Sequence, residues 1–296
     1  MNAARPEPPD PAAVAALLDR ALAEDVGSGD LTVDAILSGP VTGRAVIRAK
    51  QDGVVAGLDV AAEAFRRRDP DVRVVKEAED GDRVDAGRAL LRISGDLRGI
   101  LTAERTALNV IQRLSGIATL TARYVEAVAG TGVRILDTRK TAPGLRALDK
   151  YAVRCGGGEN HRRSLAHQVL LKENHVAAAR EAGLHPFEAV VRRLVANVPP
   201  GTFVGVEVEN LGELHRALEC DSDLILLDEL SLDDLRRAVE MRDGRPDDRR
   251  PELEASGGVT LDTVAEIAAT GVDRISIGAL THSAVAFDAS LEVLRE

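Results

Sequence analysis

A group of cationic side chains in the middle of the sequence could bind an anionic small molecule. Nine Lys and Arg stand between residues 134 and 172, where only three carboxylates oppose them, although the whole chain has a net charge of −10. Such a local cluster attracts anionic ligands. The alternative interpretation is that these residues only form a solvated basic face. Arginine offers a planar fork for carboxylate or phosphate, and lysine a point charge. The candidate anion-binding residues are Arg139, Lys140, His161, Arg162 and Lys172.

Carboxylates on two later segments could hold a metal ion. Glu207 and Glu209 are two residues apart in an expected strand, so their side chains share a face, and Asp228 ends the next expected strand. Mg²⁺ is commonly bound by one or two carboxylates together with substrate phosphates. Ion pairing with the cationic cluster is the alternative. No Cys or His spacing suits zinc.

Glycine-containing loops near the C-terminus could bind a phosphate. Ser256 and Gly257 end one expected strand, and Gly278 ends the next. Free backbone N–H groups in the late loops of an α/β barrel commonly bind phosphate. Ordinary tight turns are the alternative explanation.

The elements that must position these residues alternate between strand and helix. Six short β-rich segments each end in polar or glycine residues, which are Asp137, Lys172, Glu207 with Glu209, Asp228, Ser256 with Gly257, and Gly278. Amphipathic helical stretches at 177–198, 211–219, 232–241 and 261–270 separate most of them. This alternation predicts parallel β/α units, and polar residues at the strand ends favour a barrel, here an incomplete one. An open doubly wound sheet competes, but no G-x-G-x-x-G opens a β/α unit.

The first half of the sequence has a different pattern. A helix is expected over 11–23, and strands over 41–48, 54–56, 72–75 and 90–93. Residues 101–114 predict a helix that ends at Ser115-Gly116, and residues 119–128 predict a second one. No Lys stands at a hairpin tip, which argues against a swinging-arm carrier domain.

Composition limits the class of protein. A chain of 296 residues with 45% apolar residues suits one large or two moderate domains. It has no 18-residue apolar run and no basic-then-apolar leader. Two cysteines suit a reducing cytosol, and an acidic chain with 2% aromatics is a poor partner for nucleic acid. We therefore expect a cytoplasmic α/β protein without a membrane or nucleic-acid partner.

Three motifs closely resemble those of the quinolinate phosphoribosyltransferase family, also called decarboxylating nicotinate-nucleotide pyrophosphorylases. They are ERTALNVIQRLSGIAT (104–119), DTRKTAPGLRALDKYAVRCGGGENHR (137–162) and LKENH (171–175). The segments EDVGSGDLT, VEVENL, LILLDEL, EASGG and GVDRISIGALTHS extend the resemblance in order from about residue 24 to 284.

The resemblance implies an organisation for the whole chain. It implies an N-terminal α/β sandwich domain over 11–115, joined by the C-terminal tail 280–296, and an incomplete TIM-like α/β barrel over 116–279. Residues 1–10 would form a disordered tail. It further implies a homodimer or hexamer in which each active site is completed by the partner subunit.

The resemblance also implies the reaction and the role of each candidate residue. The substrates would be quinolinate and phosphoribosyl pyrophosphate, with Mg²⁺, and the products nicotinate mononucleotide, pyrophosphate and CO₂ for NAD biosynthesis. Arg139, His161, Arg162 and Lys172 would bind quinolinate, with Arg105 reaching in from the neighbouring subunit. The catalytic residues Lys140, Glu207 and Asp228 would hold ribose and the metal–pyrophosphate, the two acids as metal ligands. The 5′-phosphate would bind at Ser256, Gly257 and Gly278.

Two positions depart from the family pattern. His167 stands where Asp is usual, and Glu229 where Asn is usual. These departures leave open a related phosphoribosyltransferase for another carboxylated heterocycle, or a non-catalytic relative. A Schiff-base aldolase using Lys172 is a further alternative. An orotate-type phosphoribosyltransferase is disfavoured, because LDELSLDD lacks a Thr-Gly phosphate loop.

Overall fold

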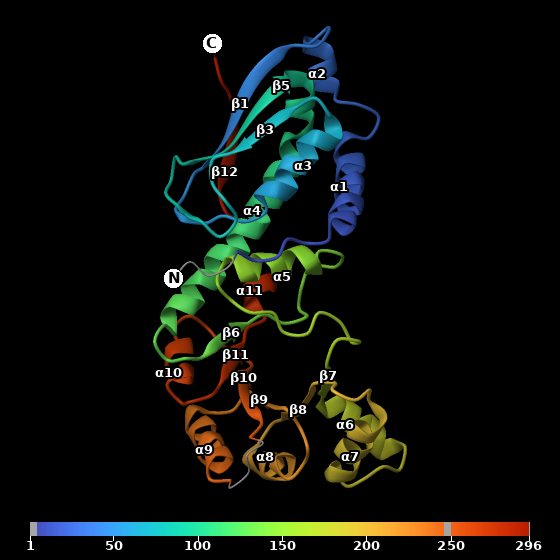
Figure 1. The fold of residues 1–296 in the computed structure, drawn as a ribbon, viewed down its shortest axis with the longest axis vertical. Coiled ribbons are helices and arrows are strands. Elements are labelled where there is room, and N and C mark those ends of the chain that lie inside the picture. Colours follow the sequence, from blue (N-terminus) through green and yellow to red (C-terminus); the bar gives the residue numbers. More distant parts are fainter. Residues whose placement is uncertain (1–4, 246–249, 296) are drawn as a thin grey trace. The chain divides into compact units, whose positions relative to one another are not determined.

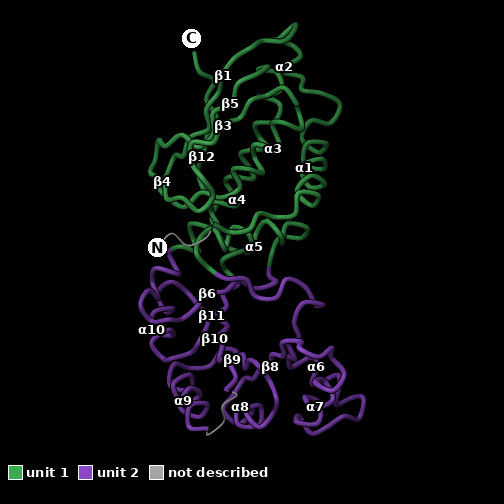
Figure 2. Tube along the Cα trace, in the orientation of Figure 1, with its two compact units in different colours: residues 1–122, 141–158, 279–296 green, residues 123–140, 159–278 purple. Residues whose placement is uncertain are grey.

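The computed structural model describes residues 5–245 and 250–295. The chain divides into two compact units, which we describe separately (Figure 2). Unit 1 comprises residues 1–122, 141–158 and 279–296, and unit 2 comprises residues 123–140 and 159–278. Residues 1–4 of the expected disordered tail lie outside the described residues. Within the described part of that tail, Arg5 lies 3.0 Å from Glu79, and Asp10 caps the first helix.

Unit 1 contains a four-stranded antiparallel sheet in the order β12-β1-β5-β3. These strands are β1 (Thr42–Ala49), β3 (Arg73–Lys76), β5 (Ala89–Asp96) and β12 (Ala289–Val293). The helix α3 (Leu58–Arg68) packs on the sheet, and α1 (Pro11–Val26) packs on α3 (Figure 1). A short ladder of β2 (Gly53–Val54) and β4 (Arg83–Val84), together with α2 (Leu31–Ile36), completes this region. The C-terminal strand β12 thus pairs with β1 of the first half of the chain.

The prediction that a helix ends at Ser115-Gly116 is wrong. One helix, α4, runs from Leu97 to Ala127. The Ser115 hydroxyl donates to the carbonyl of Ala56 at 3.2 Å and accepts from its N–H at 3.0 Å. A side chain at Gly116 would collide with the carbonyl of Val285. These small residues therefore allow other segments to approach the helix closely, and they do not terminate it.

The helix α5 (Arg146–Cys155), also in unit 1, is anchored through a buried carboxylate. Asp149 is fully buried and accepts two hydrogen bonds from the Arg113 guanidinium, at 2.9 and 2.7 Å. The backbone N–H of Ala142 also donates to Asp149, at 3.0 Å. A bidentate pair of this kind stabilises the contact and also fixes the relative orientation of the two side chains. The short helix α11 (Ala279–His282) lies in the same unit.

Unit 2 contains a six-stranded parallel sheet in the order β6-β11-β10-β9-β8-β7. The strands are β6 (Arg134–Leu136), β7 (Val169–Leu171), β8 (Val204–Val208), β9 (Leu224–Asp228), β10 (Glu252–Ser256) and β11 (Arg274–Ser276). In the described residues β6 and β7 do not pair, so the sheet stays open there. The predicted parallel α/β fold with an incomplete, barrel-like sheet is confirmed.

Helices alternate with these strands along the chain (Figure 1). They are α6 (Glu173–Glu181), α7 (Phe187–Asn197), α8 (Leu211–Leu218), α9 (Leu232–Asp243) and α10 (Val264–Ala268). Asn210 caps α8 by accepting from the N–H of Glu213, and Ser231 caps α9 by accepting from that of Asp234. The strands between them are almost wholly buried, as parallel strands covered by helices require. None of the described helices combines the length and apolarity needed to cross a membrane.

Candidate active site

The carboxyl ends of the parallel strands place most of the predicted site residues along one edge of the unit 2 sheet. Asp228 ends β9 and lies opposite Ser256, the last residue of β10. Glu207 lies on the neighbouring strand β8, and Lys172 directly follows β7. Gly278 comes two residues after β11. Because parallel strands end at the same edge of a sheet, residues far apart in sequence share one region.

Two arginines form the cationic part of this region. Arg162 is buried. Its burial and, to a lesser extent, the charge of the nearby Arg139 lower the pKa of the Arg162 guanidinium. The Nε atom of Arg139 is also buried, and it has no hydrogen-bond partner in the described part of the chain. Two cations held near each other, with an unsatisfied donor, are arranged for a bound anion.

Lys172 and Glu207 form an ion pair. The Glu207 side chain is only 8% exposed, whereas the Lys172 side chain is 42% exposed. The Lys172 backbone N–H donates to Nδ1 of His175 at 3.0 Å, at the start of α6. The family resemblance assigns Lys172 and Glu207 to different substrates, yet in the structure they pair with each other.

His161 is held inside the sheet region and contacts a second buried acid. Its Nε2 lies 3.4 Å from Oε1 of Glu254, and its Nδ1 accepts from the Arg162 backbone N–H at 2.7 Å. Asp137, which is fully buried, accepts from the His161 backbone N–H at 2.9 Å and from Asn160 Nδ2 at 2.6 Å. His161 is thus part of a buried polar cluster with Asp137 and Glu254, and it contacts the backbone of Arg162.

The loop after β10 meets the loop after β9 at a strained position. Glu229 has a φ of 54°, the one positive value among non-glycine residues that the structure describes. Its backbone N–H donates to the Ser256 carbonyl at 2.9 Å. Gly257 has a φ of 91°, and a Cβ there would collide with the Glu229 side chain. Glycine at 257 is therefore required by both backbone conformation and space.

The remaining predicted residues are solvent-exposed. Lys140 follows β6, and its backbone N–H donates to Thr138 Oγ1 at 3.0 Å. Arg105 is exposed on α4 in unit 1. His167, one of the two departures from the family pattern, accepts from the Arg163 backbone N–H at 3.3 Å through Nδ1. It therefore still supplies a hydrogen-bond acceptor in its own loop.

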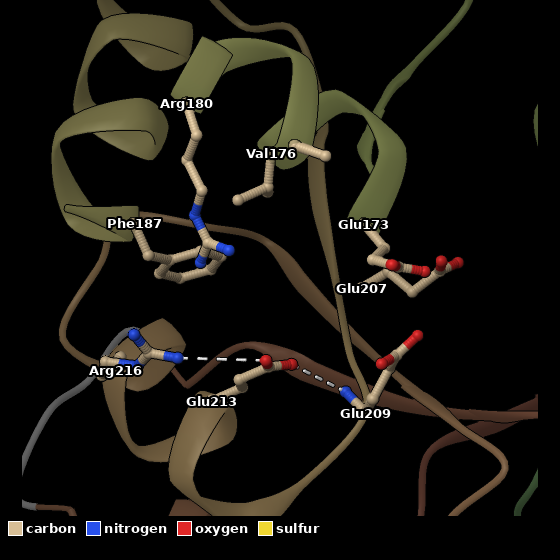
Figure 3. A pocket seen from close by; sticks show the side chains of 9 residues that line it. Glu173, Val176, Arg180, Phe187, Glu207, Glu209, Glu213 and Arg216 are labelled. Carbon is tan, nitrogen blue, oxygen red and sulfur yellow. Dashed lines mark hydrogen bonds and ion pairs between the residues drawn. The ribbon is translucent and has the colours of Figure 1, made fainter. Parts of the chain in front are cut away.

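An acidic pocket of about 80 Å³ adjoins Glu207 (Figure 3). In Figure 3, Glu173, Glu207 and Glu209 lie on one side of the pocket, and Arg180, Phe187 and Arg216 lie on the other. The Arg216 guanidinium lies 5.5 Å from the Phe187 ring centre. Repulsion from the nearby Glu173 carboxylate raises the pKa of the exposed Glu209 carboxyl. This excess of negative charge beside Glu207 suits a cation.

Sequence reasoning missed Glu254 and Arg274, which are buried side by side. Arg274 Nε lies 2.8 Å from Glu254 Oε2. A signal was available, because Glu252 and Glu254 alternate with apolar residues on one face of β10, the face that also carries Ser256. A charged residue inside a strand that is otherwise buried needs a partner.

Comparisons with known proteins agree with this arrangement. The family model for the C-terminal domain of quinolinate phosphoribosyl transferase matches residues 117–292, and that for the N-terminal domain matches residues 30–115. The Mycobacterium leprae nicotinate-nucleotide pyrophosphorylase (carboxylating) is 44% identical over 281 residues, covering 93% of this chain and 95% of the relative. A mitochondrial quinolinate phosphoribosyltransferase (decarboxylating) of Nicotiana tabacum is 40% identical, covering 94% and 81%.

Solved structures give the same result for the fold. The nicotinate-nucleotide pyrophosphorylase of Francisella tularensis superposes with a TM-score of 0.88 at 37% identity, covering 96% of each chain. NadC from Streptococcus pyogenes gives 0.89 at 38% identity, covering 97% of this chain and 99% of its own. The chain belongs to the quinolinate phosphoribosyl transferase family.

Proposed function

We propose that the protein transfers the phosphoribosyl group of phosphoribosyl pyrophosphate to quinolinate, with loss of one carboxylate. The products are nicotinate mononucleotide, pyrophosphate and CO₂, and the reaction belongs to NAD biosynthesis. The observation that carries the proposal is the electrostatic interaction of Arg162 with both Arg139 and Glu207 of β8, in a member of this family.

Quinolinate has two adjacent carboxylates, so its recognition requires several cations. Arg139 and Arg162 supply them, and the unsatisfied Nε of Arg139 gives a donor that a carboxylate can accept from. Lys172 joins them by exchanging its pairing with Glu207 for a substrate carboxylate. Each charge-assisted hydrogen bond contributes about 1.5–3 kcal/mol, and several are needed to offset desolvation of a dianion.

Glu207 and Asp228 fit a magnesium ion that arrives with pyrophosphate. They lie on neighbouring strands, and the described residues contain no group of three or more ligating side chains. A pair of carboxylates is the set that Mg²⁺ uses when waters and substrate phosphates complete its shell. Bound there, the ion would neutralise charge on the departing pyrophosphate. When Lys172 turns to quinolinate, Glu207 becomes available as a ligand.

The chemistry then proceeds in two steps. The pyridine nitrogen attacks ribose C1 as the bond from C1 to pyrophosphate breaks, and the electron pair leaves with pyrophosphate. Lys140, exposed at the same edge, neutralises charge near the ribose and pyrophosphate. The bond from C2 to its carboxylate then breaks, and the electron pair remains on C2, where the adjacent pyridinium nitrogen stabilises it until a proton is added. Ser256, Gly257 and Gly278 hold the 5′-phosphate through backbone N–H groups.

We further propose a homodimer, or a hexamer built from dimers, in which Arg105 of one subunit completes the site of another. The exposure of Arg105 on α4 is consistent with such a role. A cytoplasmic location is supported by the free thiols of Cys155 and Cys220. Burial raises the pKa of Cys155 to about 12, so this thiol is a packing group and not a nucleophile.

Product analysis tests the proposed activity. The protein is incubated with phosphoribosyl pyrophosphate, Mg²⁺ and either quinolinate or nicotinate, and nucleotide products are separated by chromatography. We expect nicotinate mononucleotide from quinolinate alone. Formation from nicotinate, or no product from quinolinate by a protein that binds phosphoribosyl pyrophosphate, would indicate a different acid substrate.

A further inference from the structure

Glu254 is a fully buried carboxylate in the middle of β10. In the parallel ladder it lies opposite Arg274 of β11. The Arg274 side chain is 8% exposed, and its Nε lies 2.8 Å from Glu254 Oε2. The Arg274 guanidinium also lies 3.2 Å from Glu252 and 5.4 Å from the Phe203 ring centre. A buried carboxylate is costly without a countercharge, and the Arg274 guanidinium supplies that countercharge.

The other oxygen of Glu254 faces the His161 imidazole, with Nε2 at 3.4 Å from Oε1. His161 Nδ1 accepts a hydrogen bond from the Arg162 backbone N–H at 2.7 Å. A ring nitrogen that accepts from an N–H carries no proton, so the ring proton is on Nε2 and points to Glu254. The Arg162 backbone N–H thus fixes the tautomer, and the Glu254 carboxylate, 3.4 Å from Nε2, favours this orientation of the ring electrostatically.

The orientation of His161 matters because of the residue that follows it. Its Nδ1 holds the Arg162 backbone N–H, while Asp137 holds the His161 backbone N–H at 2.9 Å. The Arg162 guanidinium donates to the Gln168 carbonyl at 3.2 Å. Arg162 is therefore fixed at its backbone and at its guanidinium, although the neighbouring Arg139 repels it. A cation kept beside another cation needs such a rigid support.

We infer that Glu254, held by Arg274, is a positioning residue that acts through His161 to aim Arg162 at a substrate carboxylate. The inference rests on the proposed function, because it makes Glu254 a determinant of quinolinate affinity. Phosphoribosyl pyrophosphate binds at other residues of the site, so its affinity should not depend on Glu254. A purely structural ion pair would instead affect stability and leave both affinities unchanged.

Three variants separate these possibilities. The double variant Glu254→Met with Arg274→Met removes both buried charges together, so neither is left unpaired in the interior. Glu254→Gln retains a polar oxygen beside His161 Nε2 and removes only the charge. Glu252→Gln is the matched control, since Glu252 also contacts Arg274 from β10 but lies two residues away from Glu254. Thermal unfolding first verifies that each variant is folded.

Two readouts are measured on each folded variant. Ring ¹⁵N NMR of histidine-labelled protein without substrates reports the His161 tautomer, with the signal assigned through His161→Gln. Steady-state kinetics gives the KM for quinolinate and the KM for phosphoribosyl pyrophosphate separately. Loss of one supporting polar contact near a charged group predicts about a tenfold rise in the quinolinate KM.

We expect the double variant to lose the wild-type His161 ring signals and the wild-type quinolinate affinity, with the tenfold rise in KM, while the phosphoribosyl pyrophosphate KM changes less than about twofold. Glu254→Gln should retain both properties, as should Glu252→Gln. An unchanged quinolinate KM in the folded double variant would overturn the inference, as would a wild-type His161 protonated on Nδ1. A wild-type protein that does not turn over quinolinate overturns the proposed function and the affinity claim, while the ring signals still test the Glu254–His161 contact independently.

Discussion

Unit 1 and unit 2 each contain an acid that is removed from water, but the two acids are treated in opposite ways. In unit 1, Asp80 accepts from the Tyr151 hydroxyl at 2.7 Å and from the Leu58 backbone N–H at 2.9 Å. Burial raises the pKa of Asp80 despite these neutral donors. In unit 2, burial also opposes ionisation of Glu254, but the neighbouring His161 ring and the charge of Arg274 lower its pKa below the ordinary value.

The two acids have different roles: Asp80 supports the fold of unit 1, as the Asp149–Arg113 pair also does, whereas Glu254 adjoins the candidate site. Asp80 and Tyr151 join segments of unit 1 through neutral donors, which is sufficient for stability. Glu254 is surrounded by cationic and polar groups that continue to Arg162 and Arg139. We therefore expect changes near Glu254 to act on substrate affinity, and changes near Asp80 to act on the free energy of unfolding.

The largest effect is expected from Arg139→Ala. Loss of two charge-assisted hydrogen bonds at about 1.5–3 kcal/mol each should weaken quinolinate binding by about 100-fold to 10,000-fold. Binding of phosphoribosyl pyrophosphate should remain, as measured by calorimetric titration of each substrate. Arg236→Ala, which removes an exposed arginine paired with Asp233 on α9, is the control. Unchanged quinolinate affinity in Arg139→Ala would contradict the claim that unit 2 binds quinolinate through Arg139.

Mixed dimers test whether unit 1 also contributes to catalysis through Arg105. Neither Arg105→Ala nor Arg139→Ala should be active alone. Purified heterodimers, carrying a different tag on each chain, should regain about half of the wild-type activity per dimer, since one of two symmetric sites is intact. Inactive heterodimers would show that Arg105 does not act across the interface.

Tyr151→Phe should affect only stability. It removes the hydroxyl donor of the partly buried Asp80, and the free energy of unfolding should fall by about 1–3 kcal/mol in urea titrations. The KM values for both substrates should be unchanged. A change in KM without a change in stability would contradict the separation of roles.

The two acids should also give opposite dependences of stability on pH. Because the pKa of Asp80 is raised in the folded state, its contribution is present below the ordinary value of 3.8 and is lost as pH rises through the folded pKa. Because the pKa of Glu254 is lowered, its contribution is present above 4.5 and is lost as pH falls through the folded pKa.

Unfolding free energies measured as a function of pH can reveal these signs. Relative to wild type, Asp80→Asn should gain stability as pH rises above about 4. Glu254→Gln should instead gain relative stability as pH falls below about 4. Slopes of the same sign for both variants would contradict the comparison.

The smallest expected effect is at Glu229. Its left-handed backbone is unfavourable for Glu and tolerable for Asn. Glu229→Asn should therefore raise the free energy of unfolding by about 0.5–1 kcal/mol. Glu229→Gln removes the charge but retains the strain, so it should give little gain. Equal gains from both variants would assign the effect to charge instead of backbone conformation.

The sequence predicted the parallel strands of unit 2 well, because each apolar segment ends in a polar or glycine residue that marks its boundary. Lys172, Asp228 and Ser256 all stand where these patterns placed them, at or directly after a strand end. Ser115-Gly116 misled the prediction, because small residues that allow close packing look like a helix end.

The contacts between site residues could not be predicted in the same way. The pairing of Lys172 with Glu207 depends on the register of β7 and β8, which the periodicity of either strand alone does not determine. Likewise, Glu254 and Arg274 are 20 residues apart and meet only because β10 and β11 are adjacent. The conformation of Glu229 depends on its neighbour Gly257 in another loop.

The most direct test of the central claim follows the carboxylate that the reaction removes. Quinolinate labelled with ¹³C in its 2-carboxylate is incubated with the protein, phosphoribosyl pyrophosphate and Mg²⁺, and labelled CO₂ and pyrophosphate are both quantified. The account predicts one labelled CO₂ for each pyrophosphate released, and none when phosphoribosyl pyrophosphate is omitted. Pyrophosphate release with the label retained in the nucleotide, or labelled CO₂ without phosphoribosyl pyrophosphate, would contradict it.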